Sequence, residues 1–263
     1  MSRPIISLTT DFGLADAYVG VMKGVILGIC PEAALVDISH TIAPQSIQQA
    51  AFVLSTAVPY FPVGTVHLVV VDPGVGSDRR PIAVRTERAF FVAPDNGVLG
   101  LALAPDPPRQ VVRLSNQAYR LPSVSATFHG RDIFAPAAAH LACGLDLLRL
   151  GEPIPPADLV ALPHAEPQRE GEGIWRGLVL HVDHFGNLIT NFRAEHLPPG
   201  PLRLAVGAET IAGLHQTFAD VAPGDLVAYL GSSGYVEIAE RNGNAARRLA
   251  AGVGSPVYIS QRR

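Results

Sequence analysis

Acidic residues follow two apolar segments near the start of the chain. Asp11 and Asp16 come after the apolar run 4–9, and Asp72 comes after the β-branched run 65–71. In open α/β sheets, ligands bind outside the carboxyl ends of the strands, so both positions are candidate binding or catalytic sites. Each also has a structural interpretation, because Asp is a favoured helix N-cap and an Asp before Pro-Gly is typical of a turn.

A histidine stands at a further candidate position, just before an expected helix over residues 131–143. His129 lies in the segment FHGRD, and a histidine in a loop at a helix start can titrate near neutral pH. The alternative interpretation is that Asp132 caps the helix and that His129 has no chemical role.

The segment HVDHFGN, residues 181–187, holds two imidazoles, a carboxylate and an amide. His181 and Asp183 share one face of an extended strand and could hold a metal ion, although no spacing such as His-Glu-x-x-His supports this. Asp183 and Asn187 could instead bind a polar organic ligand, with Phe185 available for stacking. The chain has no Gly-x-Ser-x-Gly motif, which disfavours an α/β-hydrolase triad.

The chain up to about residue 150 alternates between strand-like and helix-like periodicity. This alternation predicts an α/β fold with a mostly parallel sheet and helices on both faces, and the apolar run 66–71 fits a strand buried on both sides. Expected strands cover residues 4–9, 34–39, 65–71, 81–86, 89–92 and 110–114. Expected helices cover residues 16–29, 46–60, 98–104 and 131–143.

Beyond that point, stretches rich in Pro, Gly and polar residues lead into short β-type segments without helical periodicity. These segments (177–182, 202–206, 226–230, 235–239 and 256–260) predict a small antiparallel β-barrel or β-sandwich, and GSSG at 231–234 is a hairpin signal. We therefore expect an N-terminal α/β domain over residues 1–162, a linker over 163–173 and a C-terminal β-barrel domain over 174–263.

Composition argues against several classes of protein. The 20 Lys and Arg against 23 Asp and Glu leave no basic excess for nucleic acid, and no stretch reaches the ~18 apolar residues of a membrane span. The N-terminus does not resemble a signal peptide, so we expect a cytoplasmic protein.

Cys30 and Cys143 are interpreted as buried, inert thiols of a reducing compartment. Only 16% of residues are charged, and a subunit interface is one destination for the surplus apolar surface.

Ten motifs, in order along both halves of the chain, resemble those of the S-adenosyl-L-methionine (SAM) hydroxide adenosyltransferases, or SAM hydrolases, which are related to fluorinase and chlorinase. The resemblance implies an α/β N-terminal domain and a β-barrel C-terminal domain. It also implies a homotrimer, with each active site between the N-terminal domain of one subunit and the C-terminal domain of its neighbour. The motifs are TTDFG (9–13), CP (30–31), VDISH (36–40), FPxGTVH (61–67), VVDPGVG (70–76), APDNG (93–97), TFHGRDIFAP (127–136), DHFGNLITN (183–191), TFAD (217–220) and SxGY (232–235).

The reaction that this resemblance implies is hydrolysis of SAM to adenosine and L-methionine, by attack of water or hydroxide at ribose C5′. The sulfonium leaves as a neutral thioether, so the implied reaction needs no cofactor or metal, but it needs a nucleophile held in line with the C5′–S bond. The family's catalytic set maps onto Asp72, Arg79 and His129. Asp72 would accept a hydrogen bond from the water, His129 would hold or take its proton, and Arg79 would orient the set. An ordinary His is a better proton acceptor at neutral pH than an ordinary Asp.

The resemblance also implies substrate contacts. Asp11 would accept hydrogen bonds from the ribose hydroxyls, and Asn187 would match the donor and acceptor pattern of the adenine edge. Asp16, Asp183 and Ser232 would hold the methionine ammonium and carboxylate. The full implied set of substrate-binding residues is Asp11, Asp16, Gly130, Asp183, Phe185, Asn187, Phe218 and Ser232, with the two phenylalanines packing on the adenine ring.

Some positions separate this chain from its halide-using relatives. Fluorinase has Tyr at the positions of Asp72 and His129, and a long insertion near residues 86–89 that is absent here. A carboxylate beside the nucleophile favours water over halide. Departures from the family pattern occur at Gly231, Ser233 and the pair 240–241. The alternative functions are a SAM- or adenosine-binding protein with little turnover, a halide-using adenosyltransferase, and a metallohydrolase built on residues 181 and 183.

Overall fold

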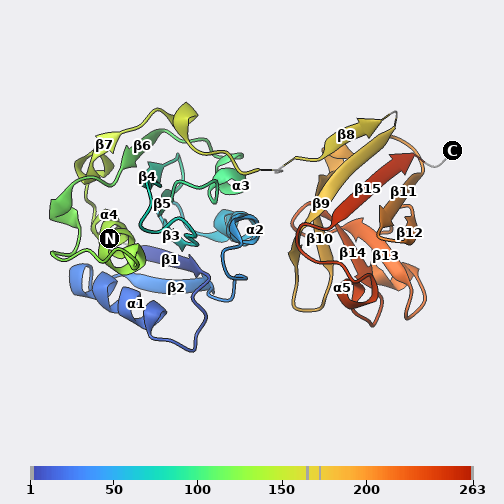
Figure 1. The fold of residues 1–263 in the computed structure, drawn as a ribbon, viewed down its shortest axis with the longest axis horizontal. Helices are drawn as coiled ribbons and strands as arrows, with labels where there is room; N and C mark the ends of the chain where they lie inside the picture. The colour runs from blue at the N-terminus through green and yellow to red at the C-terminus, as the bar shows by residue number, and fades with distance from the viewer. Residues whose placement is uncertain (1–2, 164–165, 172, 262–263) are drawn as a thin grey trace. The chain divides into compact units, whose positions relative to one another are not determined.

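The computed structural model describes residues 3–163, 166–171 and 173–261. The chain divides into two compact units, Met1–Pro163 and His164–Arg263. The first unit combines a sheet with helices, and the second is built mainly of strands (Figure 1). Within the described ranges, no helix is both long enough and apolar enough to cross a membrane.

The first unit, as far as it is described, is built on a seven-stranded sheet in the order β2-β1-β3-β5-β4-β6-β7. β2, β1, β3 and β5 run parallel to one another, whereas β4 runs antiparallel to β5 and β6, and β7 antiparallel to β6. β4 reverses direction because a short hairpin, closed between Thr86 and Ala89, joins it to β5. The expected α/β class is confirmed, with a mixed sheet. The strands are β1 (Ile5–Thr10), β2 (Ala34–Ser39), β3 (Val66–Val70), β4 (Pro81–Arg85), β5 (Phe90–Pro94), β6 (Gln110–Arg113) and β7 (Glu152–Pro153).

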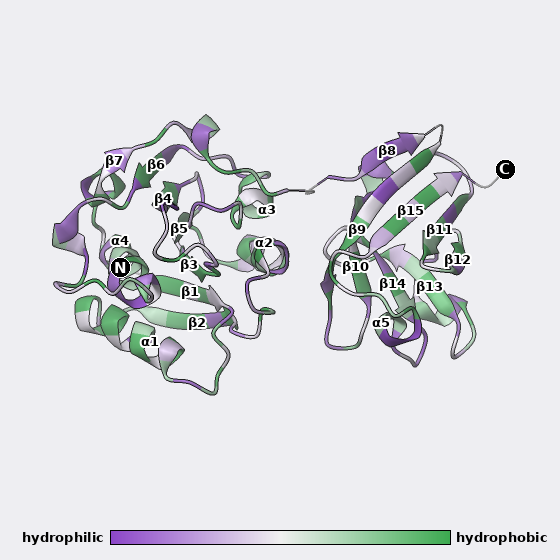
Figure 2. Ribbon diagram, viewed as in Figure 1, coloured by the Kyte–Doolittle hydropathy of each residue, from purple (hydrophilic) through white to green (hydrophobic). Residues whose placement is uncertain are grey.

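Helices cover both faces of this sheet. Along β3, Leu68 packs in a core with Met22 and Ala138, whereas Val69 packs in a second core with Leu54 and Ala102. Successive strand residues point to opposite faces, so α1 (Tyr18–Ile29) and α4 (Ala135–Ala142) lie on one face, and α2 (Ile47–Ala57) and α3 (Gly100–Leu103) on the other. Most residues of the central strands are accordingly hydrophobic (Figure 2). Short 3₁₀ helices are Val58–Tyr60, Gln117–Tyr119, Leu147–Leu150 and Pro156–Asp158.

The helix expected over residues 131–143 is divided in two. A π-helical turn, Gly130–Phe134, precedes α4, and Ala135 N donates to Gly130 O. Pro136 has no N–H to continue an α-helical ladder, and the Asp132 carbonyl accepts instead from Leu121 N at 2.9 Å. Such turns are frequent at functional sites, and this one begins directly after His129.

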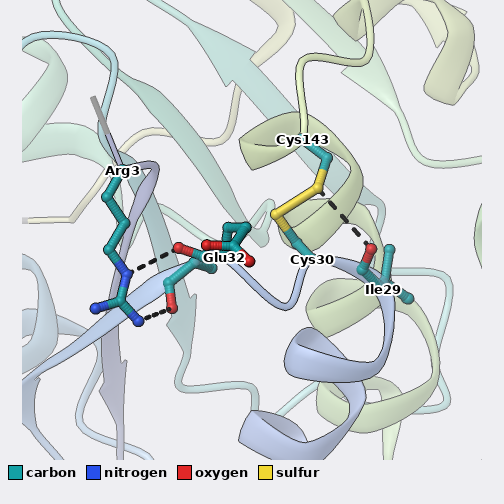
Figure 3. Close-up of a disulfide and its surroundings, with 6 residues drawn as sticks. Arg3, Ile29, Cys30, Glu32 and Cys143 are labelled. Carbon is teal, nitrogen blue, oxygen red and sulfur yellow. Dashed lines mark hydrogen bonds between the residues drawn. A yellow bond between two sulfur atoms is a disulfide. The ribbon is translucent and has the colours of Figure 1, made fainter. Parts of the chain in front are cut away.

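Cys30 and Cys143 form a disulfide (Figure 3), so their interpretation as inert free thiols is wrong. Cys30 ends α1 and Cys143 ends α4, and the packing of these helices brings the two α-carbons to 5.9 Å. The cysteines are 113 positions apart, and their pairing depends on helix packing, which spacing alone does not reveal. Close by, Arg3 donates to the backbone carbonyls of Glu32 and Ala33 and ties down the start of the chain.

The described part of the second unit is an antiparallel eight-stranded sheet in the order β12-β11-β15-β9-β10-β14-β13, with β8 paired to β9. His215 N, beyond β12, donates to Ala228 O of β13 at 2.8 Å, so the sheet curls into a nearly closed barrel. The expected β-barrel architecture is confirmed. The strands are β8 (Gln168–Gly171), β9 (Ile174–Val182), β10 (Leu188–Arg193), β11 (Leu202–Val206), β12 (Glu209–Ala212), β13 (Leu226–Leu230), β14 (Tyr235–Glu240) and β15 (Pro256–Gln261); the helices are α5 (Ala245–Arg248) and the 3₁₀ turns Ala194–His196 and Phe218–Asp220.

Two strands of this unit were not expected, and a third lies in the expected linker. β8 falls within residues 163–173 and pairs with β9, and β10 and β12 are additional. β10 carries buried polar residues that interrupt its apolar pattern. They are satisfied by neighbouring strands, because Thr190 Oγ1 donates to Val236 O at 2.8 Å and Asn191 Oδ1 accepts from Leu178 N at 2.9 Å.

Candidate active site

Asp72 lies just beyond β3 and forms a buried ion pair with Arg79. Arg79 Nε donates to Asp72 Oδ1 at 2.9 Å, and Arg79 Nη2 donates to Asp72 Oδ2. The two side chains are only 7% and 6% exposed. Val75 N donates to Asp72 O at 3.1 Å, so Asp72 also begins the expected turn. Its carboxylate is therefore held in one orientation by two donors of the Arg79 guanidinium and by a backbone hydrogen bond from Gly74.

The same arginine contacts His129. Arg79 Nη2 lies 3.0 Å from His129 Nδ1. A guanidinium has only donors, so Nδ1 accepts and the imidazole is neutral, with its proton on Nε2. Another donor, Arg79 Nη1, is buried and has no hydrogen-bond partner among the described residues. The three expected catalytic residues thus lie together, with one buried donor still to be satisfied.

Burial perturbs both titratable members of this group. Burial raises the pKa of Asp72, against the opposing effect of the Arg79 charge. Burial also lowers the pKa of His129, and the Arg79 charge lowers it further. The lowered pKa of His129 favours a neutral imidazole, in agreement with the acceptor role of its Nδ1. Perturbed, mutually bonded groups of this kind are typical of functional sites.

Asp11 follows β1 and holds a neighbouring loop. Its Oδ2 accepts from Gln45 N at 2.8 Å, whereas Ala17 is the N-cap of α1 and no side chain caps that helix. The interpretation of Asp11 as an N-cap is therefore wrong. Gly13 N donates to His40 O at 2.7 Å, so the loop between β2 and α2 is held near both of its ends. Asp16 lies between Asp11 and the start of α1 and is exposed.

Three aromatic rings join the Asp11 loop to the His129 segment. The ring centroids of Phe12 and Phe128 are 5.9 Å apart, and Tyr18 lies 5.7 Å from Phe12 and 5.3 Å from Phe128. Phe12 adjoins Asp11 and Phe128 adjoins His129, so this cluster fixes the two parts of the site relative to each other.

The residues after His129 have packing roles. Gly130 is buried, and a Cβ built on it would lie 3.2 Å from Met22 Sδ, so a larger residue would push the turn away from α1. Asp132 accepts from Ser125 N at 2.7 Å and from Arg131 Nε at 2.5 Å, and its side chain is fully buried. Its interpretation as a helix cap is wrong, because it lies inside the π turn and holds the preceding loop.

Asp183 organises the loop between β9 and β10. Its Oδ1 accepts from the backbone N–H groups of Phe185 at 2.9 Å and Asn187 at 2.8 Å. Its Oδ2 accepts from Asn187 Nδ2 at 2.8 Å.

A pocket of about 500 Å³ opens beside Asn187. Phe185 is 72% exposed and Phe218 is 41% exposed. Aromatic rings with one fixed amide suit a planar heteroaromatic ligand. The pocket is lined by Phe185, Asn187, Thr217, Phe218, Ala219, Glu240, Arg241, Asn242 and Gly243.

Arg241, noted in the sequence only as a departure from the family pattern, supports this pocket. Its Nη1 donates to Ala219 O at 3.3 Å and to Val221 O. These bonds tie the segment that carries Phe218 to the end of β14. Sequence reasoning missed this role because it depends on contacts between loops 20 positions apart.

Tyr229 and Glu237, also missed from the sequence, form a polar pair across β13 and β14. Tyr229 OH donates to Glu237 Oε2 at 2.8 Å, and the two residues are direct cross-strand partners. The Tyr229 ring lies 4.8 Å from that of Phe218. The hairpin signal at 231–234 could have revealed the pair, because a tight turn there places residues 229 and 237 opposite each other.

Ser232 lies in that turn and is exposed. Gly231 N donates to Tyr235 O at 2.9 Å, and β13 pairs antiparallel with β14. The expected hairpin is confirmed.

His181 and Asp183 gain no further metal ligand. Across the described parts of the chain, no group of three or more His, Cys, Asp and Glu side chains is arranged to hold a metal ion. His181 lies on β9 opposite Ile189 of β10, and burial lowers its pKa.

The residues expected from the sequence thus fall into two groups, one in each unit. In the first group, Asp72, Arg79 and His129 form the buried charged cluster; in the second, Phe185, Asn187 and Phe218 line the aromatic pocket. The groups are Asp11, Asp16, Asp72, Arg79, His129 and Gly130 in the first unit, and Asp183, Phe185, Asn187, Phe218 and Ser232 in the second.

Comparison with known proteins places both halves of the chain in one family. Residues 6–151 match the SAM hydroxide adenosyltransferase N-terminal domain, and residues 177–258 match the C-terminal domain. A protein of Salinispora tropica named (R)-S-adenosyl-L-methionine hydrolase is 42% identical, over 98% of each chain. A protein of the same name from Thermus thermophilus is 43% identical, over 98% of this chain and 99% of its own.

A solved structure agrees. The crystal structure of an uncharacterized conserved protein from Thermotoga maritima superposes with a TM-score of 0.88 at 37% identity, covering 97% of this chain and all of the other. Both domain matches, the extent of the relatives and the shared fold lead to one conclusion: the chain belongs to the SAM hydroxide adenosyltransferase family.

Proposed function

We propose that the protein hydrolyses SAM to adenosine and L-methionine. The observation that carries the proposal is the buried cluster of Asp72, Arg79 and His129, in which Arg79 Nη1 has no partner among the described residues. Relatives 42% and 43% identical over nearly the whole chain are named (R)-SAM hydrolases. The cluster combines an acceptor (the Asp72 carboxylate), a cation (Arg79) and a donor (His129 Nε2–H). Together these groups suit the capture of a water nucleophile.

The reaction is a displacement at ribose C5′. The water oxygen forms the new bond to C5′, the C5′–S bond breaks with its electron pair going to sulfur, and one proton is released. The leaving group is a neutral thioether and needs no general acid. The proposed reaction also needs no cofactor, because positioning and partial desolvation of the water supply the main effects.

Each member of the cluster has a proposed role. Asp72 accepts a hydrogen bond, and then the proton, from the water; His129, which the sequence favoured as proton acceptor, has no free acceptor nitrogen because Nδ1 is bonded to Arg79. His129 donates from Nε2–H to the water oxygen and holds it, because Nδ1 is occupied by Arg79. Arg79 orients both groups and stabilises hydroxide character. Water is preferred to halide because the Asp72 carboxylate repels an anion at the nucleophile position.

In the first unit, Asp11 is proposed to bind the ribose hydroxyls of SAM. Its carboxylate accepts from Gln45 N through one oxygen, and each carboxylate oxygen has two lone pairs, so the ribose hydroxyls have acceptors. Asp16 is exposed and is proposed to contact the methionine part.

The second unit is proposed to bind adenine and methionine. Asn187 reads the adenine edge through its amide oxygen and its second amide hydrogen, with Phe185 and Phe218 against the ring. The 500 Å³ pocket that these residues line supports this assignment. Asp183 and Ser232 contact the methionine ammonium and carboxylate.

A homotrimer with active sites shared between subunits is a further part of the proposal. The exposed apolar side chains near Asp11, Leu14 at 71% and Tyr18 at 48%, support burial against another subunit. Analytical ultracentrifugation tests the trimer. A monomeric variant that keeps all catalytic residues is expected to lose SAM turnover.

A cytoplasmic location is also part of the proposal, and the Cys30–Cys143 disulfide argues against it, because disulfides are rare in reducing compartments. Alkylation of intact cells before lysis tests both points. Cytosolic protein with both thiols alkylated supports the location and shows the disulfide to be absent there.

Incubation of the purified protein with SAM, followed by chromatography, tests the function. Equal amounts of adenosine and L-methionine, lost in Asp72→Asn, are expected. A 5′-chloro-5′-deoxynucleoside that forms only with chloride would instead indicate halide transfer. Tight adenosine binding without product would indicate a binding protein, and loss of activity in EDTA would indicate a metallohydrolase.

A further inference from the structure

The turn between β13 and β14 accommodates a carboxylate where a side chain would otherwise lie. A Cβ built on Gly231 would overlap the carboxyl group of Glu237. The Glu237 carboxylate therefore occupies the space beside Ser232 that any larger residue at 231 would fill. Gly231, a departure from the family pattern, is thereby explained by the position of Glu237.

Glu237 is held in this place by Tyr229. Tyr229 OH donates to Glu237 Oε2 at 2.8 Å, and its ring packs on Phe218, which lines the aromatic pocket. The tyrosine is only 7% exposed. Glu237 is thus connected through one rigid side chain to the wall of the proposed adenine pocket.

Negative charge accumulates at this end of the barrel. Ile189 of β10 is paired with His181 of β9 on one side and with Glu237 of β14 on the other, and Asp183 follows His181 by two residues, so both carboxylates belong to neighbouring strands at this end of the barrel. Burial and the Asp183 charge raise the pKa of Glu237. In the described part of the chain, no ion pair joins either of them to a Lys or Arg side chain. Asp183 accepts three hydrogen bonds and Glu237 accepts one, but neither has a cation from the described residues beside it, so a cationic group of a ligand would complete the pair.

A second observation points to a ligand at the same turn. Ser233 Oγ is buried and has no hydrogen-bond partner among the described residues. Buried hydroxyls are usually satisfied, and an unpaired hydroxyl in the turn that also carries Gly231 and Ser232 suits the zwitterionic end of an amino acid, which has both a donor and an acceptor.

We propose that Glu237 binds the α-ammonium of the methionine part of SAM together with Asp183, and so determines selectivity for sulfonium substrates that carry an amino acid. This inference rests on the proposed function. It adds a specificity-determining residue that lies outside all ten motifs.

Two matched variants separate this role from a structural one. Glu237→Gln keeps an oxygen that can accept from Tyr229 but removes the charge. Tyr229→Phe keeps the charge but removes the hydrogen bond. Both are measured in the Asp72→Asn background so that SAM is not consumed, and thermal melts confirm that both variants fold.

Calorimetry with four ligands gives the readout: SAM, decarboxylated SAM, the 2-oxo analogue of SAM that lacks the ammonium, and adenosine. Glu237→Gln is expected to weaken SAM and decarboxylated SAM at least about tenfold and to change the other two ligands by less than about twofold. Tyr229→Phe is expected to change all four affinities by a similar factor. Equal losses for all four ligands in Glu237→Gln, or no loss for SAM, would overturn the inference.

Wild-type turnover, measured alongside, keeps the two proposals apart. If the wild-type protein forms no adenosine and the Asp72→Asn protein binds neither SAM nor adenosine, the proposed function fails. If turnover and binding are present but Glu237→Gln does not discriminate between the ligands, only the assignment of Glu237 fails.

Discussion

Arg79 donates from Nη2 to Nδ1 of His129 across 3.0 Å, although 50 positions separate the two residues in the sequence. The contact requires a neutral imidazole with its proton on Nε2. The same guanidinium also holds both oxygens of Asp72. One arginine therefore sets the orientation of the carboxylate and the tautomer of the histidine, and the first two predictions depend on it.

Arg79→Lys is expected to lower kcat/KM by about 100-fold or more, because an ammonium keeps the charge but cannot bond to two groups in a fixed fork. Steady-state kinetics checks this. Arg80→Lys is the matched control, since Arg80 pairs with Asp95 instead. The control is expected to lower the melting temperature while kcat/KM stays within about twofold. Equal kinetic losses in both variants would contradict the assignment.

The pH dependence of kcat/KM is expected to show an acid limb below pH 6.5. Burial and the Arg79 charge lower the pKa of His129 from 6.5, so the neutral form persists to lower pH, and its protonation breaks the bond to Arg79. Activity is thus present above the lowered pKa and lost as the pH falls through it. In His129→Asn the limb should change position and reflect Asp72 alone. A wild-type limb above pH 6.5 would contradict this account.

Asp183→Ala and Asn187→Ala are expected to weaken adenosine binding to a similar extent, by about 1–3 kcal/mol each. Asp183 acts by holding Asn187, so the double variant should be little worse than either single one. Calorimetry of the full double-mutant cycle measures this coupling. Strictly additive losses would show that the two residues act independently.

Stability is expected to fall between pH 6.5 and pH 4 through His67. Burial lowers its pKa from 6.5 to about 4, and its Nδ1 lies 2.7 Å from Ser7 Oγ. The unfolded chain binds a proton there at higher pH than the folded chain, so the stabilisation is complete above pH 6.5 and lost as the pH falls. At about 1.4 kcal/mol per pKa unit, the effect is about 3 kcal/mol.

Urea unfolding at several pH values measures that slope. His67→Gln is expected to flatten it, and His184→Gln, at an exposed position, is expected to leave it unchanged. An unchanged slope in His67→Gln would show that other groups control acid stability.

Replacing both Cys30 and Cys143 by Ala is expected to lower the free energy of unfolding by about 2–4 kcal/mol, because the disulfide closes a long loop in the unfolded chain. Thiol titration of the unfolded, unreduced protein should find no reactive thiol. Dithiothreitol should destabilise the wild type but not the double variant. Two reactive thiols in the unreduced protein would contradict the pairing.

Most of the fold follows from periodicity, and the failures have physical causes. Strands such as β2, β11 and β13 begin and end where the sequence predicts, because apolar runs there end at turn residues. β10 is missed because Thr190 and Asn191 interrupt its pattern and are satisfied only by other strands. The disulfide is missed because two helix ends must first pack together.

The candidate site, too, has parts that the sequence predicts and parts that only the packed structure reveals. The positions of Asp72, Asn187 and their neighbours are fixed by local turns, and the sequence motifs reveal them. The contact between Arg79 and His129, by contrast, arises only when the loop between β3 and β4 meets the start of the π turn. Glu237 carries no motif, and only the register of its hairpin places it beside Gly231.

Turnover in oxygen-18-labelled water shows whether water itself attacks ribose C5′. Mass spectrometry of the products is expected to find the label in the 5′-hydroxyl of adenosine and none in L-methionine. Unlabelled adenosine, label in methionine, or no adenosine at all would contradict the account.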